Sequence, residues 1–154
     1  MLAIKRILVP IDFSYCARHA LDYALSFARR FEADIDLLHV YEPPFDLGDM
    51  PVQIANGPPQ PIGEYIRAQV DQNLQALLAS CPDDVKVTSH LITGQVEHEV
   101  VRIAEQVGAD LIIMGTHGRT GLSRFFLGSV AERVLRHASC PVLTVRASDE
   151  EDDA

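Results

Sequence analysis

The stretch of sequence that decides the fold spans residues 110–137. It reads DLIIMGTHG at residues 110–118 and, after a connecting segment, GSVAERVLRH at residues 128–137. The apolar run at residues 111–114 is typical of a buried strand, whereas the residues from Ser129 to His137 have the apolar spacing of a helix. The pattern predicts a strand that ends at Gly115, then a loop, and then a helix that Gly128 and Ser129 open.

Glycines at the end of a strand and at the start of the next helix indicate an anion site. A helix N-terminus presents unpaired N–H groups and a partial positive charge, which suits a phosphate. Gly115 and Gly118 let the backbone approach an anion without a Cβ in the way. Residues 115–138 also carry four arginines against the single acid Glu132, a local charge of +3 in a protein of net charge −9. These arginines are Arg119, Arg124, Arg133 and Arg136. The sequence therefore predicts that this loop binds a phosphorylated small molecule.

Strands and helices alternate along the rest of the chain. Strands are expected at residues 6–11, 35–40, 85–92, 110–115 and 141–146, and apolar residues recur at helical spacing between them. Ser14 is expected to cap the first helix, and Gly108 to end the third. Residues 41–61 carry six of the nine prolines and are expected to form a long loop. The order predicts one α/β domain over residues 1–146, with a parallel sheet and helices on both faces.

Composition limits the class of partner. The 13 basic and 22 acidic residues argue against nucleic acid or an anionic membrane surface. No apolar run approaches ~18 residues, so no membrane span is expected. The three cysteines form no CxxC, which indicates neither a disulfide framework nor a zinc site and fits a reducing cytoplasm. Residues 147–154 are expected to be a solvated acidic tail.

Polar or glycine-rich loops follow two of the predicted strands. Asp12 comes directly after the first strand, and Gly115 closes the fourth. Ligands of parallel sheets bind beyond the carboxyl ends of the strands, where the strand order reverses. If the first and fourth strands are neighbours, Asp12 and Gly115 share one crevice. The Asp12 carboxylate can then accept hydrogen bonds from a ribose or an adenine amine.

Each of these features also has a purely structural interpretation. The glycines can form only a tight turn, Asp12 can be an N-cap or turn residue, and Ser129 can be an N-cap, a role compatible with phosphate contact. His117 is interpreted as solvated or bonded within its loop rather than catalytic. The segment Arg124-Phe125-Phe126 is either a lid or loop packing. No lysine follows Gly128 and no GxGxxG follows the first strand, so the loop is neither a Walker A motif nor a dinucleotide fingerprint.

Three motifs together resemble the universal stress protein family. They are RILVPIDFS at residues 6–14, the pair GTHG and GSVAE at residues 115–118 and 128–132, and SCPVLTV at residues 139–145. The specific part is the spacing G-x2-G-x9-G-[ST], which is complete here. The resemblance covers about residues 5–146, and the proline-rich loop and the acidic tail lie outside its motifs.

The resemblance implies a five-stranded parallel sheet of strand order 3-2-1-4-5 and membership of the nucleotide-binding branch of the family. It implies an adenine nucleotide, ATP, with Mg²⁺ able to accompany the phosphates. Adenine and ribose would be surrounded by Pro10, Ile11, Asp12 and Val40. Ribose and phosphates would be held by Met114, Gly115, His117, Gly118, Arg119, Gly128, Ser129 and Val130. The family also implies a homodimer joined through the last strand, residues 141–145.

These observations lead to the hypothesis of a cytoplasmic ATP-binding protein of stress response or signalling, with little or no turnover. No nucleophile elbow or Ser/His/Asp set is visible, and no histidine spacing suggests a metal. Two alternatives stay open at this point: an interaction module with no nucleotide, and a slow ATPase.

Overall fold

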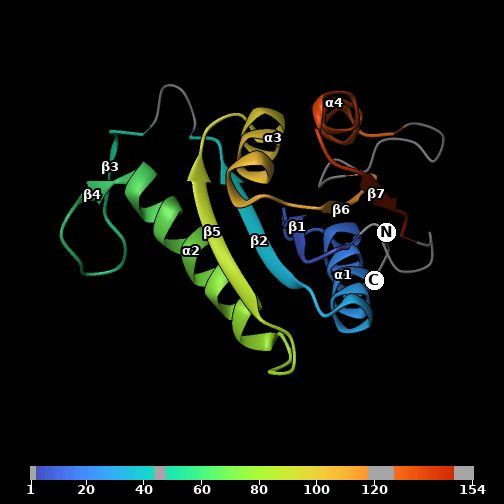
Figure 1. Ribbon diagram of the computed structural model, residues 1–154. Coiled ribbons are helices and arrows are strands. Elements are labelled where there is room, and N and C mark those ends of the chain that lie inside the picture. Colours follow the sequence, from blue (N-terminus) through green and yellow to red (C-terminus); the bar gives the residue numbers. More distant parts are fainter. Residues whose placement is uncertain (1–2, 44–47, 118–126, 148–154) are drawn as a thin grey trace.

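The computed structural model describes residues 3–43, 48–117 and 127–147. Its main sheet consists of β1 (Arg6–Pro10), β2 (Asp34–Tyr41), β5 (Val87–Thr93), β6 (Leu111–Gly115) and β7 (Val142–Val145). These strands are all parallel and lie in the order β5-β2-β1-β6-β7 (Figure 1). Numbered among themselves along the chain, they have the order 3-2-1-4-5. The predicted α/β fold with a five-stranded parallel sheet is therefore confirmed.

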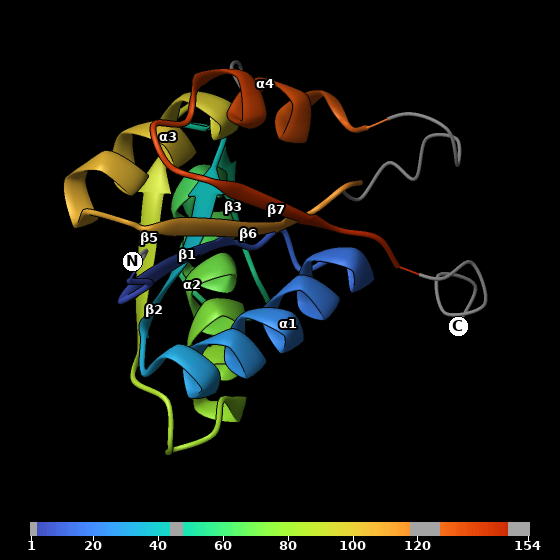
Figure 2. The ribbon, with the colours of Figure 1, turned by 45° about the vertical axis from the view of Figure 1, so that its right-hand side comes forward.

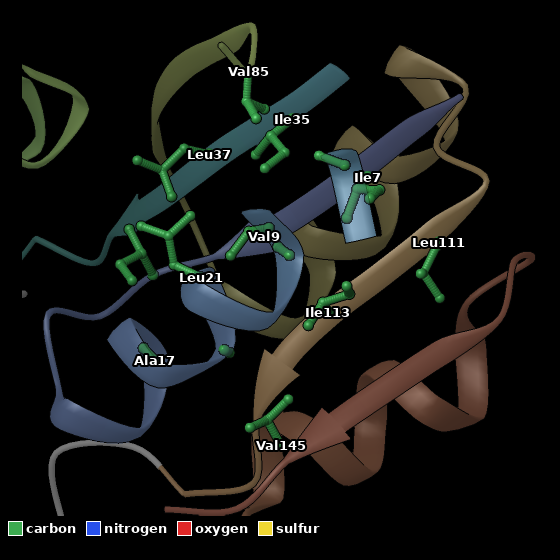
Figure 3. Close-up of a cluster of buried hydrophobic side chains, with 14 of the residues drawn as sticks. Ile7, Val9, Ala17, Leu21, Ile35, Leu37, Val85, Leu111, Ile113 and Val145 are labelled. Atoms are coloured by element: carbon green, nitrogen blue, oxygen red, sulfur yellow. The ribbon is translucent and has the colours of Figure 1, made fainter. Parts of the chain in front are cut away.

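Helices cover both faces of the sheet (Figure 2). Helices α1 (Tyr15–Phe31) and α2 (Ile62–Ser80) lie on one face, and α3 (Val96–Val107) and α4 (Ser129–His137) lie on the other. Alternate side chains of β1 enter two separate cores, because Ile7 and Val9 pack towards α1 while Leu8 packs towards α3. All three are fully buried. Figure 3 shows the first of these cores. Burial on both faces explains why this strand is apolar without alternation.

The helix ends follow the predicted signals. The Ser14 hydroxyl accepts a hydrogen bond from the Ala17 N–H and caps α1. Gly108 ends α3 with a left-handed φ of 68°, a conformation that glycine adopts without steric cost. Among the residues that the structure describes, no helix is both long and apolar enough to cross a membrane.

The proline-rich stretch departs from the prediction. Residues 41–61 were expected to form a loop throughout, but β3 (Pro51–Val52) and β4 (Gln60–Pro61) pair as a short antiparallel ladder. The Ile62 N–H donates to the Met50 carbonyl at 2.9 Å and extends this pairing towards α2. A ladder of two residues needs few N–H donors, so prolines are tolerated in it. The expectation of a long loop was wrong for these four residues and for Tyr41, which is the last residue of β2.

A buried carboxylate joins three strands of the sheet. The side chain of Asp36 on β2 is 1% exposed, and its Oδ2 lies 2.7 Å from Nε of Arg6 on β1. Its Oδ1 lies 2.7 Å from Nε2 of His90 on β5. Burial acts to raise the pKa of Asp36. The hydrogen bonds from Arg6 and His90, together with their charges, outweigh burial, so the pKa lies below its ordinary value of 3.8.

Asp36→Asn is expected to lower the free energy of unfolding at neutral pH by roughly 2 kcal/mol, the scale of a hydrogen bond to a charged group. A carboxyl whose pKa is lowered by folding stabilises the protein above its ordinary pKa, and this contribution is lost as the pH falls through the lowered pKa. The difference between the two proteins should therefore shrink in acid. Urea unfolding measured at neutral pH and again below pH 3.8 tests this. A difference that stays constant across this range would contradict it.

Candidate functional site

A cavity of about 350 Å³ opens at the carboxyl ends of β1, β2 and β6, beside the N-terminus of α4. The strand order reverses between β1 and β6, since the chain goes from β1 to β2 on one side and to β6 on the other. Parallel sheets bind their ligands at this kind of position. The size of the cavity is in the range of small-molecule sites.

The cavity brings together all the predicted site residues that the structure describes. Its lining includes Pro10, Ile11, Asp12, Val40, Met114, Gly115, His117, Gly128, Ser129 and Val130. The two remaining candidates, Gly118 and Arg119, lie outside the described residues, as does the segment Arg124-Phe125-Phe126. The neighbourhood expected for Asp12 and Gly115 is present because β1 pairs with β6.

Sequence reasoning missed eight further lining residues: Ala17, Leu38, His39, Val96, Val100, Thr116, Leu127 and Ala131. Val96 and Val100 stand four residues apart on α3 and form part of an apolar wall. Their helical spacing was visible in the sequence, but the spacing alone does not distinguish a core position from a cavity wall. Thr116 lay inside the decisive motif and was not selected.

The turn after β1 fixes the position of Asp12. Its Oδ1 accepts a hydrogen bond from the Ser14 N–H at 3.0 Å, which makes Asp12 a turn residue, while Ser14 provides the cap. Phe13 between them has a left-handed φ of 64°. The Ile11 carbonyl lies 2.7 Å from Nδ1 of His39, whose ring is 4.8 Å from that of Phe13. This local network holds the carboxylate at the cavity wall.

The backbone of β2 turns polar groups towards the cavity at Val40. The register of β1 and β2 ends with Pro10 opposite Leu38, and the Leu38 carbonyl accepts from the Ile11 N–H. Backbone groups of a parallel strand face the same neighbour at every second residue. The N–H and C=O of Val40 therefore face the β1 side, beyond the end of the β1 ladder. They present one donor and one acceptor next to each other.

The first turn of α4 supplies further donors. Gly128 is the N-cap residue, with φ −60° and ψ 151°, and Ser129 is the first helical residue. Ser129 is therefore not the N-cap, which corrects that structural interpretation. The first N–H groups of a helix have no partner within it. In α4 these N–H groups include the ones of Ser129, Val130 and Ala131, and all three residues line the cavity.

The two described glycines of the motif are required by packing. A Cβ on Gly115 would lie 2.9 Å from Sγ of Cys16 and 3.1 Å from its carbonyl carbon, so this glycine lets β6 approach α1. A Cβ on Gly128 would lie 2.8 Å from the Thr116 carbonyl oxygen. The sequence suggested close approach to an anion as the reason for Gly115, and the structure adds the close approach of two protein segments.

The positive charge expected beside the site is partly cancelled. Arg133 of α4 pairs with Glu97 of α3, and Arg136 pairs with Glu132 one turn earlier at 2.8 Å. Both arginines therefore have carboxylate partners on the helices. The count of +3 for residues 115–138 already includes Glu132, and Glu97 is one further acid beside this segment. Among the described lining residues, Asp12 is the only carboxylate.

Comparison with known proteins extends the match beyond these motifs. The model of the universal stress protein family matches residues 3–146. Universal stress protein MJ0531 of Methanocaldococcus jannaschii is 35% identical over 148 residues, covering 96% of this chain and 85% of that protein.

Solved structures agree with this match. That of the hypothetical protein MJ0577 of the same organism has a TM-score of 0.74 at 28% identity and covers 96% of this chain and 99% of its own. A universal stress protein in complex with cAMP has a TM-score of 0.60 at 25% identity, covering 95% and 99%. The chain belongs to the universal stress protein family.

Proposed function

We propose that this protein binds ATP in the cavity at the ends of β1, β2 and β6, and that it acts in stress response or signalling with little or no turnover. The observation that carries the proposal is the arrangement of two backbone sites at this cavity. The donor–acceptor pair of Val40 is on one wall, and the first turn of α4 is on another. A cytoplasmic location belongs to the proposal, because the three free cysteines fit a reducing compartment.

The apolar part of the cavity suits a purine. Its walls include Ile11, Val96, Val100 and Met114, which exclude water from a flat aromatic base. The backbone donor and acceptor of Val40, which face the β1 side, match the adjacent acceptor and amine on the Watson–Crick edge of adenine. The Asp12 carboxylate on the same side supplies an acceptor for a ribose hydroxyl. The structural neighbour solved with cAMP contains the same base.

The α4 side of the cavity suits the phosphates. Backbone N–H groups and the partial positive charge of the helix N-terminus favour an anion there. The Ser129 hydroxyl adds a side-chain donor at the first position of the helix. Gly118 and Arg119 enter the proposal only through the family resemblance, and Mg²⁺ would bind through the phosphates of the nucleotide.

Asp12 variants test the assignment of base and ribose. Asp12→Ala and Asp12→Asn are both expected to lower the affinity for ATP, ADP and adenosine alike by about 10-fold or more, because each removes a charged hydrogen-bond acceptor. Asp12→Asn retains an oxygen for the Ser14 N–H and should keep the wild-type thermal stability, whereas Asp12→Ala should lose some of it. Calorimetry with the three ligands, and mass spectrometry of nucleotide that co-purifies, give the measurement.

An unmodified protein that binds neither ATP nor adenosine at millimolar concentration is not a nucleotide-binding protein. Steady phosphate release from ATP would instead favour the slow ATPase.

A further inference from the structure

Thr116 lines the cavity and contacts β7, the N-cap of α4, α1 and the adjacent His117. It is 4% exposed, although it follows the last residue of β6. Its N–H donates to the Val145 carbonyl of β7 at 2.9 Å, and its carbonyl accepts from the Gly128 N–H at 2.8 Å. Its hydroxyl lies 2.9 Å from Nδ1 of His117 and 4.0 Å from Sγ of Cys16. The backbone of Thr116 is therefore held at both ends, which fixes the position of its hydroxyl.

The neighbours of this hydroxyl indicate where its proton lies. The Cys16 thiol is 3.3 Å from the Val145 carbonyl, and a carbonyl can only accept, so the thiol proton points to Val145. The sulfur remains a weak acceptor for Thr116, at a longer distance than His117 Nδ1. Because Nδ1 is the nearer and stronger acceptor, these distances favour the arrangement in which the Thr116 hydroxyl donates to Nδ1. In that arrangement a neutral His117 carries its proton on Nε2.

The other nitrogen of the ring is a buried group that needs a partner. Nε2 of His117 is buried without a hydrogen-bond partner among the residues that the structure describes. An unpaired buried N–H is unfavourable in a folded protein. His117 lines the cavity next to the start of α4, where the phosphates are proposed to bind. A phosphate oxygen would accept a hydrogen bond from this N–H. An unprotonated Nε2 would instead repel the phosphate oxygen, because both atoms are acceptors.

We infer that Thr116 is a positioning residue that fixes His117 as the Nε2–H tautomer, so that the imidazole donates a hydrogen bond to an anionic oxygen of the bound nucleotide. This inference rests on the proposed function and assigns the polarity of one of its donors. Thr116 itself acts through His117.

The first arm of the test uses the ligand-free protein. Nitrogen-15 NMR of the imidazoles at about pH 8, above the ordinary histidine pKa of about 6.5, distinguishes the two neutral tautomers. The His117→Gln variant identifies the His117 signals by their loss. The expected result is the Nε2–H tautomer in the unmodified protein and in Thr116→Ser, and a shift towards a mixture of tautomers in Thr116→Val. Thr116→Ser shows whether the hydroxyl alone is sufficient.

The second arm compares ligands with and without phosphate. Thr116→Val should lower the affinity for ATP by about tenfold, the scale of one hydrogen bond to a charged group. It should leave the affinity for adenosine unchanged. Thr116→Ser should restore the affinity for ATP. If Thr116 has a purely structural role, Thr116→Val should instead lower the affinities for ATP and adenosine together.

Three results would overturn the inference. These are the Nδ1–H tautomer in the unmodified protein, an unchanged tautomer in folded Thr116→Val, and equal losses for ATP and adenosine. If the unmodified protein binds no adenine compound, the proposed function fails together with the phosphate role of His117. The NMR arm still decides separately whether Thr116 sets the tautomer.

Discussion

Gly128→Ala is expected to lower the affinity for ATP by more than about 100-fold while the parallel sheet stays folded. The new Cβ would lie 2.8 Å from the Thr116 carbonyl oxygen, too close for either backbone to stay in place. The displacement breaks the 2.8 Å hydrogen bond from the Gly128 N–H to that oxygen and moves the start of α4. Losing two hydrogen bonds to a charged phosphate, each worth about 1.5–3 kcal/mol, corresponds to a loss on this scale.

The matched control is the same substitution at a glycine with free space. A Cβ on Gly48 would meet nothing within 4 Å, so Gly48→Ala should leave both stability and ATP affinity unchanged. Calorimetry gives the affinity, and circular dichroism shows whether the variant remains folded. A folded Gly128→Ala protein with the affinity of the wild type would show that the first turn of α4 does not hold the phosphates.

Local sequence patterns predict much of the fold and part of the candidate site. The apolar strands, the caps at Ser14 and Gly108, and the start of α4 at Ser129 depend on local chemistry, and local patterns predict them. The rule that ligands bind at the carboxyl ends of parallel strands predicts one crevice for Asp12 and Gly115 if the first and fourth strands are neighbours. These strands do pair, and both residues line the cavity. Ten of the candidate residues line this cavity, and the close packing around Gly115 and Gly128 is a further reason for these glycines that the sequence did not show.

What the sequence did not predict depends on contacts between distant segments. Arg133 is neutralised by Glu97, which is 36 residues away, and no periodicity indicates that pair. Whether the Cβ of Gly115 would meet a ligand or Cys16 depends on how closely α1 lies against β6. His39 lines the cavity, and its ring bonds the carbonyl of Ile11, the residue that follows β1. Such roles follow from packing and become visible only in three dimensions.

The second large expected effect is the loss of a dimer that forms through the last strand, β7. β7 is at one edge of the sheet, and we propose that two copies pair through it antiparallel about a two-fold axis. The carbonyls of Pro141 and Val145 accept from the Ile112 and Thr116 N–H groups of β6 and its end. Since backbone groups alternate along a parallel strand, the N–H and C=O groups of Val142 and Thr144 face outward, where a second copy would pair.

Thr144→Pro is expected to convert the dimer into a folded monomer. Proline removes the outward N–H of Thr144 and places its ring where the partner strand would lie, but no hydrogen bond to β6 is lost. Thr144→Ala keeps the N–H and should remain dimeric. Leu143→Pro removes an N–H that faces β6 and should lower the thermal stability instead.

Light scattering at micromolar concentration, together with thermal unfolding, distinguishes these outcomes. A folded Thr144→Pro protein that remains a dimer would place the interface elsewhere, and a monomeric wild-type chain would contradict the dimer itself. Nucleotide binding by the monomeric variant gives a further result. No residue of β7 is among the described lining residues of the cavity, so ATP affinity should survive the loss of the dimer. A parallel loss of affinity would instead mean that pairing of β7 supports Thr116, whose N–H is bonded to the Val145 carbonyl at the end of this strand.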